Sequence, residues 1–174
     1  MPVITLNQFE ALPDALTLDH YNFYLGTIPG GGDTTSLMIK CMDCVIPGMS
    51  NEAIEVQCSA HVRKFRGRKM FPRVMAVTFM EDITLDTLTK LRLWDQAIVG
   101  TNSATSIGNI AQYSVQPTLQ VFDQKGSLAD QIQFVNLFLQ DIQDIALSSS
   151  SSTAAQVTAQ FSYDYPIFNG VPIR

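Results

Sequence analysis

The sequence predicts a mainly β fold, in which antiparallel sheets form a β-sandwich or barrel-like body with one main α-helix. Several runs alternate apolar and polar residues with a period of two, which is typical of strands with one buried and one wet face. Proline and glycine interrupt these runs where the chain must reverse its direction. One further run repeats its apolar residues at helical spacing. No shift in composition divides the chain, so we expect a single domain over residues 1–174.

Three strand-like runs, at 37–48, 54–62 and 73–82, lie in the first half of the chain. In the second run, apolar residues occupy the even positions and polar residues the odd ones, which predicts one buried face and one solvent-exposed face. A proline and a glycine separate the first run from the second, and a basic turn separates the second from the third. We therefore expect the three runs to pair as an antiparallel meander.

A strand at 20–28 and a glycine-rich loop at 29–35 precede this stretch. The loop lacks the Gly-Lys-Ser/Thr ending that holds a phosphate, because an aspartate stands in that region, so we interpret it as a connector. After the stretch, Thr84 or Asp86 is expected to cap a helix that ends at Gly100. The apolar stripe of this helix is Leu85, Leu88, Leu91, Trp94 and Ile98.

The last third of the chain predicts more sheet. A strand is expected at 112–122, and a closing strand at 156–163 alternates apolar and polar residues. The run at 128–139 could be a helix or a strand, and we favour a strand because its aromatic and β-branched residues suit a sheet. The segments 101–109 and 148–152 consist mostly of small and polar residues, so we interpret both as loops.

The composition indicates a surface that is covered in the working state. Charged residues make up 16% of the chain, against a usual value of about 25%. Uncharged polar residues fill the difference, with 13 Ser, 14 Thr and 13 Gln. A free monomer stays soluble through mixed charges, so this surface favours self-assembly.

The compartment follows from what the chain lacks. The first cation is Lys40, so the N-terminus lacks the positively charged start that is typical of a secretory signal, and no apolar run reaches the roughly 18 residues needed to span a membrane. We expect synthesis in the cytoplasm. Three cysteines do not form a disulfide framework, so we expect them to be reduced.

Six of the 11 cations fall within residues 63–73, although the net charge is -5. From Glu81 to Asp164 the chain carries nine acids against three cations. A basic turn and an acidic remainder suit head-to-tail stacking of copies. Direct nucleic-acid binding and a merely solvated turn are the alternatives. The candidate contact residues are Arg63, Lys64, Arg66, Arg68 and Lys69.

Cys41, Cys44, Cys58 and His61 have the composition of a zinc site. Both pairs lie in strand-like runs, where residues three apart point to opposite faces, so we interpret the thiols as buried apolar groups and expect no metal or cofactor. A zinc site and a redox dithiol remain alternatives. The two histidines and the absence of known catalytic motifs argue against an enzyme.

An ordered set of motifs connects this chain to a known family. The motifs are Lys40-Cys41, Pro47-Gly48, Ile54 to Val56, the Gly/Arg-rich turn, Val77 to Asp82, the Trp94 helix, Tyr113, Val121 to Gly126 and Val157 to Tyr165. Together they resemble the major tail tube proteins of contractile-tailed bacteriophages. The resemblance implies a structural virion protein whose hexameric rings stack into a tail tube inside a contractile sheath.

The resemblance also implies partners: the tail sheath, the baseplate, a tail terminator, and DNA as non-specific cargo during ejection from a virion assembled in the host cytoplasm. The tube of a bacterial injection system, such as a tailocin or type VI system, is the related alternative, and a monomeric nucleic-acid-binding or zinc module the unrelated one. A DNA conduit should not hold phosphates through cations. The candidates for its lining are Gln116, Thr118, Gln120, Gln156, Thr158 and Gln160.

Overall fold

The computed structural model describes residues 19–172 except 60, 71, 100–108 and 146–152. Its strands form a five-stranded sheet in the order β1-β6-β7-β10-β11, a four-stranded sheet in the order β2-β5-β9-β8, and a separate hairpin of β3 and β4. The strands are β1 (Tyr21–Tyr24), β2 (Cys41–Cys44), β3 (Ser50–Cys58), β4 (His61–Met70), β5 (Val74–Met80), β6 (Thr118–Phe122), β7 (Leu128–Val135), β8 (Phe138–Ile142), β9 (Gln156–Ser162), β10 (Tyr165–Phe168) and β11 (Val171–Pro172).

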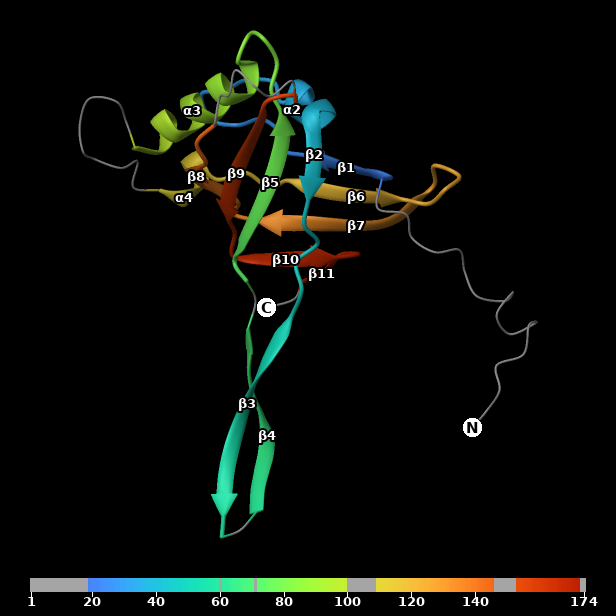
Figure 1. The fold of residues 1–174 in the computed structure, drawn as a ribbon, viewed down its shortest axis with the longest axis vertical. Helices are drawn as coiled ribbons and strands as arrows, with labels where there is room; N and C mark the ends of the chain where they lie inside the picture. Colours follow the sequence, from blue (N-terminus) through green and yellow to red (C-terminus); the bar gives the residue numbers. More distant parts are fainter. Residues whose placement is uncertain (1–18, 60, 71, 100–108, 146–152, 173–174) are drawn as a thin grey trace.

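The two larger sheets pack face to face around one apolar core, and their strands cross in Figure 1. Phe23, Leu119 and Phe134 fill the core from the five-stranded sheet, and Val77 and Phe161 fill it from the four-stranded sheet. All strand pairs with a recorded register are antiparallel. The predicted mainly β sandwich with one main helix is therefore confirmed.

The main helix is α3 (Asp86–Val99), close to the predicted bounds. Trp94 lies fully buried on its apolar stripe, with its ring centroid 5.6 Å from that of Phe161. Its indole N–H donates a hydrogen bond of 2.9 Å to the carbonyl of Tyr113. The helix begins on a different cap from the two predicted, because the carboxylate of Glu81 accepts hydrogen bonds from the backbone of Thr87 and Leu88.

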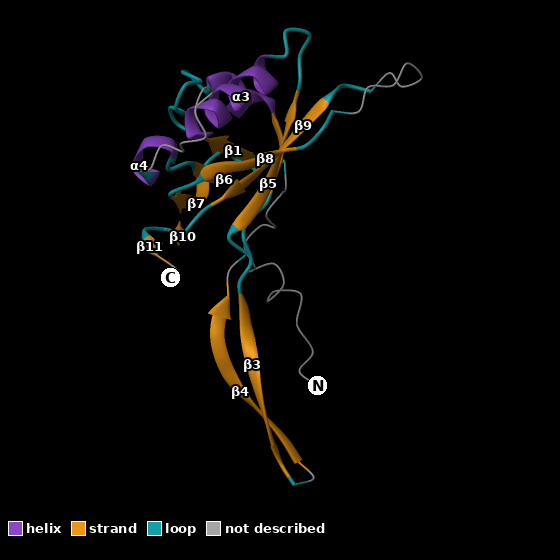
Figure 2. Ribbon diagram, turned by 90° about the vertical axis from the view of Figure 1, so that its left-hand side faces the viewer, coloured by secondary structure: helices purple, strands orange, loops and turns teal. Residues whose placement is uncertain are grey.

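The hairpin of β3 and β4, here called the arm, projects away from the body in both views (Figures 1 and 2). Its strands have nine and ten residues, so it spans about 30 Å at about 3.3 Å per residue. The chain reverses between Cys58 and His61, which pair across the turn. The prediction of one strand over 54–62 with a buried face is therefore wrong, because every described side chain of β3 is exposed. The predicted basic turn after it is also wrong, because the basic segment is itself the strand β4.

Some other boundaries also differ from the prediction. The first half of the run at 37–48 belongs to helix α2 (Thr35–Lys40), and the run at 112–122 divides into helix α4 (Ile110–Tyr113) and β6. The run at 128–139 divides into β7 and β8 because Asn136, with a φ of 53°, turns the chain.

The short C-terminal strands β10 and β11 were not predicted, and β1 is shorter than the strand predicted at 20–28. The closing strand β9 is confirmed almost to its ends. The loops predicted at 101–109 and 148–152 fall almost entirely outside the described residues.

Candidate assembly surfaces

The arm has one apolar face and one polar face. Ile54 pairs with Phe65, and Val56 pairs with Arg63, so these four side chains lie on the same side of the ribbon. Ile54, Val56 and Phe65 are 51%, 42% and 49% exposed, although they are large apolar side chains. A two-stranded hairpin alone is at best marginally stable in water, and an exposed apolar face of this kind is typical of an interaction surface.

A charge stands at each end of the apolar face. Arg63 lies over the ring of Phe65, 6.0 Å from its centroid. Glu52 lies on the same face of the arm, on the side of Ile54 toward the body. A Cβ added to Gly67 would lie 3.1 Å from the side chain of Ile54 and 3.2 Å from the Cβ of Glu52, so both side chains are on the face toward which that Cβ would point. The alternation predicted over 54–62 holds only as far as Cys58, where β3 ends, and its apolar side is exposed, because the pattern does not determine which surface covers it.

All five predicted basic contact residues lie on β4, and all five are exposed. Lys64 pairs with Glu55 at 2.8 Å, and Arg66 donates to the side chain of Asn51 at 3.4 Å. Residues 50–70 hold five cations and two acids, a net charge of +3, so the rest of the chain carries -5 minus +3, or -8. The arm is thus a cationic extension of an acidic body.

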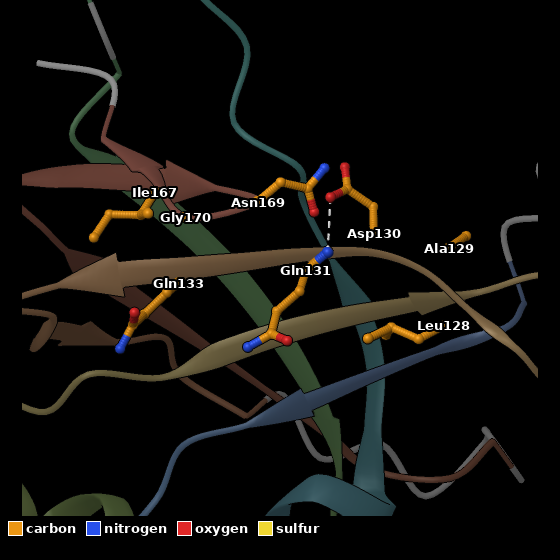
Figure 3. Close-up of a pocket in the computed structure, with 8 residues that line it drawn as sticks. All are labelled: Leu128, Ala129, Asp130, Gln131, Gln133, Ile167, Asn169 and Gly170. Carbon is orange, nitrogen blue, oxygen red and sulfur yellow. Dashed lines mark hydrogen bonds between the residues drawn. The ribbon is translucent and has the colours of Figure 1, made fainter.

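The first set of predicted lining residues lies on the outer face of the five-stranded sheet. Gln120 stands opposite Gln131, Thr118 stands opposite Gln133, and Gln133 donates to the side chain of Gln116 at 3.4 Å. Figure 3 shows Gln131 and Gln133 on the same side of β7, beside a hollow of about 430 Å³. This face presents rows of amides without a charge among these residues.

The second set lies on the outer face of the four-stranded sheet. Thr158 stands opposite Thr78, and their hydroxyl oxygens are 3.3 Å apart. The exposed Asp141 pairs with Gln160. Since the two sheets share one core, the two predicted sets face in opposite directions.

The thiols do not follow the predicted arrangement. A bulge in β2 places both Cys41 and Cys44 opposite core-facing residues of β5, so they do not point to opposite faces. Burial raises the pKa of the Cys41 thiol to about 12. Cys58 is exposed near the tip of the arm, so its expected burial is wrong. Within the described part of the chain, no group of three or more potential metal ligands occurs.

The loop before α3 lies at the end of the body opposite the arm (Figures 1 and 2), and an ion-pair cluster joins this loop to α2 and α3. Lys40 of α2 contacts Asp82 at 2.7 Å and Asp86 at 3.5 Å, and Lys90 contacts Asp86 at 3.1 Å. Hydrogen bonds from Lys40 and Thr84 hold the pKa of Asp82 well below its usual range. These contacts tie α2, the loop before α3, and α3 itself into one unit.

An apolar groove of about 490 Å³ lies beside this cluster. The side chains that line it come from α3 and the residue before it, from the end of β8 and the segment after it, and from the residue before β9. They are Leu85, Leu88, Arg92, Ile142, Gln143, Asp144, Ile145 and Ala155. The loop before α3 also exposes Ile83 completely. Sequence reasoning missed this groove because Leu85 and Leu88 were assigned to the buried stripe of the helix.

A β-sandwich with a projecting arm that exposes an apolar face is typical of proteins that assemble with other chains. The model of the phage tail tube protein family matches residues 18–169, and the chain belongs to that family. The family resemblance inferred from the motifs is thereby confirmed: the chain is a tail tube subunit. The family is structural, so the chain is not an enzyme. No curated protein matches the sequence.

Solved structures show the same fold at low sequence identity. A chain of the sheath-tube complex of an extracellular contractile injection system is 11% identical, with 95% of this chain and 97% of that chain covered and a TM-score of 0.62. A chain of the sheath/tube terminator of such a system is 14% identical, with 91% and 99% covered and a TM-score of 0.64. A type six secretion system protein is 17% identical, with 92% and 91% covered and a TM-score of 0.55.

Among the described residues, no helix combines the length and the apolar character that a membrane crossing requires.

Proposed function

We propose that copies of this chain form six-membered rings that stack into the hollow tube of a contractile particle. The observation that carries this proposal is the arm, because its apolar face is about half exposed in the single subunit and its reach of about 30 Å extends well beyond the body. The sheath, baseplate and terminator are its partners, and assembly takes place in the host cytoplasm. Purified protein viewed by negative-stain microscopy should form rings or tubes, and a protein that stays monomeric at every concentration contradicts the proposal.

The basic residues of the arm contact the acidic surface of a neighbouring copy. The charges of +3 on residues 50–70 and -8 on the rest of the chain support this contact. Reversing Arg66, Arg68 and Lys69 to Glu should abolish stacking while each body stays folded, because the arm lies outside the core. The matched control exchanges the same residues with retained charge, as Arg66→Lys, Arg68→Lys and Lys69→Arg, and should still assemble.

Salt gives a second measurement of this contact, since assembly through exposed charges should weaken as salt is raised. Normal tubes from the charge-reversed protein would sink the interface proposal. If that protein also lost a salt-sensitive affinity for DNA that the parent protein has, the arm would be a nucleic-acid contact instead.

The tube conducts DNA along only one of the two sheet faces, because the two faces point in opposite directions. We favour the outer face of the four-stranded sheet, with Gln156, Thr158 and Gln160. Neighbouring copies can continue a sheet around a closed ring only if both edge strands of that sheet can pair with another strand. The five-stranded sheet ends in the two-residue β11, where Pro172 has no N–H to donate, so the four-stranded sheet is better suited to continue around the channel.

Lysine substitutions test which face lines the channel. Gln160→Lys should leave tube assembly intact and slow DNA ejection, more strongly at low salt, because a lysine holds phosphates. Gln120→Lys, on the opposite face, is the matched control and should eject DNA at the parent rate. Slow ejection from the Gln120→Lys tube alone would move the lining to the five-stranded sheet.

A bacterial injection system is the second candidate, favoured by the solved structures of similar fold. The cargo separates the two candidates. Particles purified with this tube should contain DNA in a phage and lack a genome in an injection system.

A further inference from the structure

We propose that the groove beside α3 binds the apolar face of an arm from another copy of this chain. This inference rests on the proposal that copies stack, and it names the surface that receives the arm. Apolar side chains of the groove, including Leu85, Ile142 and Ile145, match the apolar side chains Ile54 and Phe65 of the arm. Covering both surfaces removes apolar area from water on both partners, which favours their association.

The two surfaces lie at opposite ends of the subunit. Both views place the loop before α3 at the end that lies opposite the arm (Figures 1 and 2). Two unlike surfaces at opposite ends form a head-to-tail contact, which repeats from copy to copy without pairing two arms. With one arm and one groove on each subunit, every interior copy of a stack therefore has both its arm and its groove covered by a neighbour.

The charges on the two surfaces are complementary. The apolar face of the arm is flanked by Glu52 toward the body and by Arg63 toward the tip. The lining of the groove includes Arg92 on α3 and Asp144 after β8. We assign Glu52 to Arg92 and Arg63 to Asp144, because both of these pairs carry opposite charge. The reverse assignment brings like charges together in both pairs.

The groove is held in shape before any partner arrives. The carboxylate of Asp82 accepts hydrogen bonds from the backbone N–H of Thr84 at 3.0 Å and from its hydroxyl at 2.6 Å. These bonds fix the loop in which Leu85 has a φ of 53° and stands 49% exposed. A preformed site needs less ordering on binding. Because the chain itself supplies an uncovered apolar ribbon of matching charge, a second copy is the occupant.

Disulfide cross-linking between two variant chains tests the contact. Both chains carry Cys58→Ser, one also carries Phe65→Cys, and the other also carries Ile145→Cys. After mixing with an excess of the Phe65→Cys chain, assembly and mild oxidation, most of the Ile145→Cys chain should migrate as a covalent dimer on a non-reducing denaturing gel. Gln57→Cys, on the polar face of the same arm, replaces Phe65→Cys in the control and should leave that chain monomeric.

A charge exchange gives an independent measurement. Asp144→Arg and Arg63→Asp should each reduce assembly, and the double variant should regain it, because the pair is restored with its charges exchanged. Three results overturn this inference if the parent protein still assembles. They are the absence of a cross-link between Phe65→Cys and Ile145→Cys, equal cross-linking from Gln57→Cys, and purely additive losses of assembly in the double variant. A parent protein that remains monomeric overturns the stacking proposal itself, and this inference falls with it.

Discussion

Replacing Trp94 by alanine removes the largest fully buried side chain of the core. The change leaves a cavity against Phe161 and deprives the carbonyl of Tyr113 of its donor. Truncations of this kind cost about 3–5 kcal/mol in unfolding free energy. For a chain of this size, about 1 kcal/mol corresponds to about 2–4 °C, so the melting temperature should fall by about 6–20 °C.

The measurement needs a background in which assembly adds no stability, and the charge-reversed arm variant supplies one. Urea unfolding of that protein with and without Trp94→Ala gives the difference directly. Trp94→Phe is the matched control, because it keeps most of the apolar volume and removes only the indole donor, and it should cost clearly less. An unchanged denaturation midpoint for Trp94→Ala would refute the reasoning that this side chain joins the helix to the sandwich.

Two further predictions concern the start of α3. Glu81→Gln should lower the unfolding free energy by about 1–2 kcal/mol, because the charged cap of the Thr87 and Leu88 amides is lost, and an equal midpoint in urea would contradict the role of this cap. The hydrogen bond from Lys40 lowers the folded-state pKa of Asp82. The ionised Asp82 carboxylate therefore contributes fully to the unfolding free energy above its unfolded pKa of about 4, and this contribution is lost as the pH falls through the folded pKa. Stability should therefore drop in acid in the parent protein and less in Asp82→Asn, and parallel pH profiles would exclude this contribution.

The helix and the closing strand could be predicted from the sequence because their own residues determine their faces. Trp94 and its neighbours recur at helical spacing, and β9 alternates without interruption. Such patterns record which side of an element is covered. They were sufficient for the fold class and for the motifs that led to the family.

The arm could not be predicted because alternation alone does not say what covers the apolar face. A strand that packs on its own core and a strand that waits for another chain have the same pattern. The reversal after Cys58 also lacks the Asn-Gly signal of a tight hairpin, and Ser59 takes a φ of 53° in its place. The bulge in β2 also has no recognisable signal in the sequence. It turns the Cys44 side chain to the same face of the sheet as that of Cys41.

The arm at one end of the subunit and the groove at the other have a consequence for how a filament grows. A stack joined through these two surfaces is polar: its first ring leaves one kind of surface free, and its last ring leaves the other. An initiating platform and a capping protein then need different shapes, because one must offer a groove to arms and the other must offer arms, or a substitute for them, to grooves. Elongation in one direction then follows when the initiating platform covers one end of the stack, because new subunits can add only at the other end.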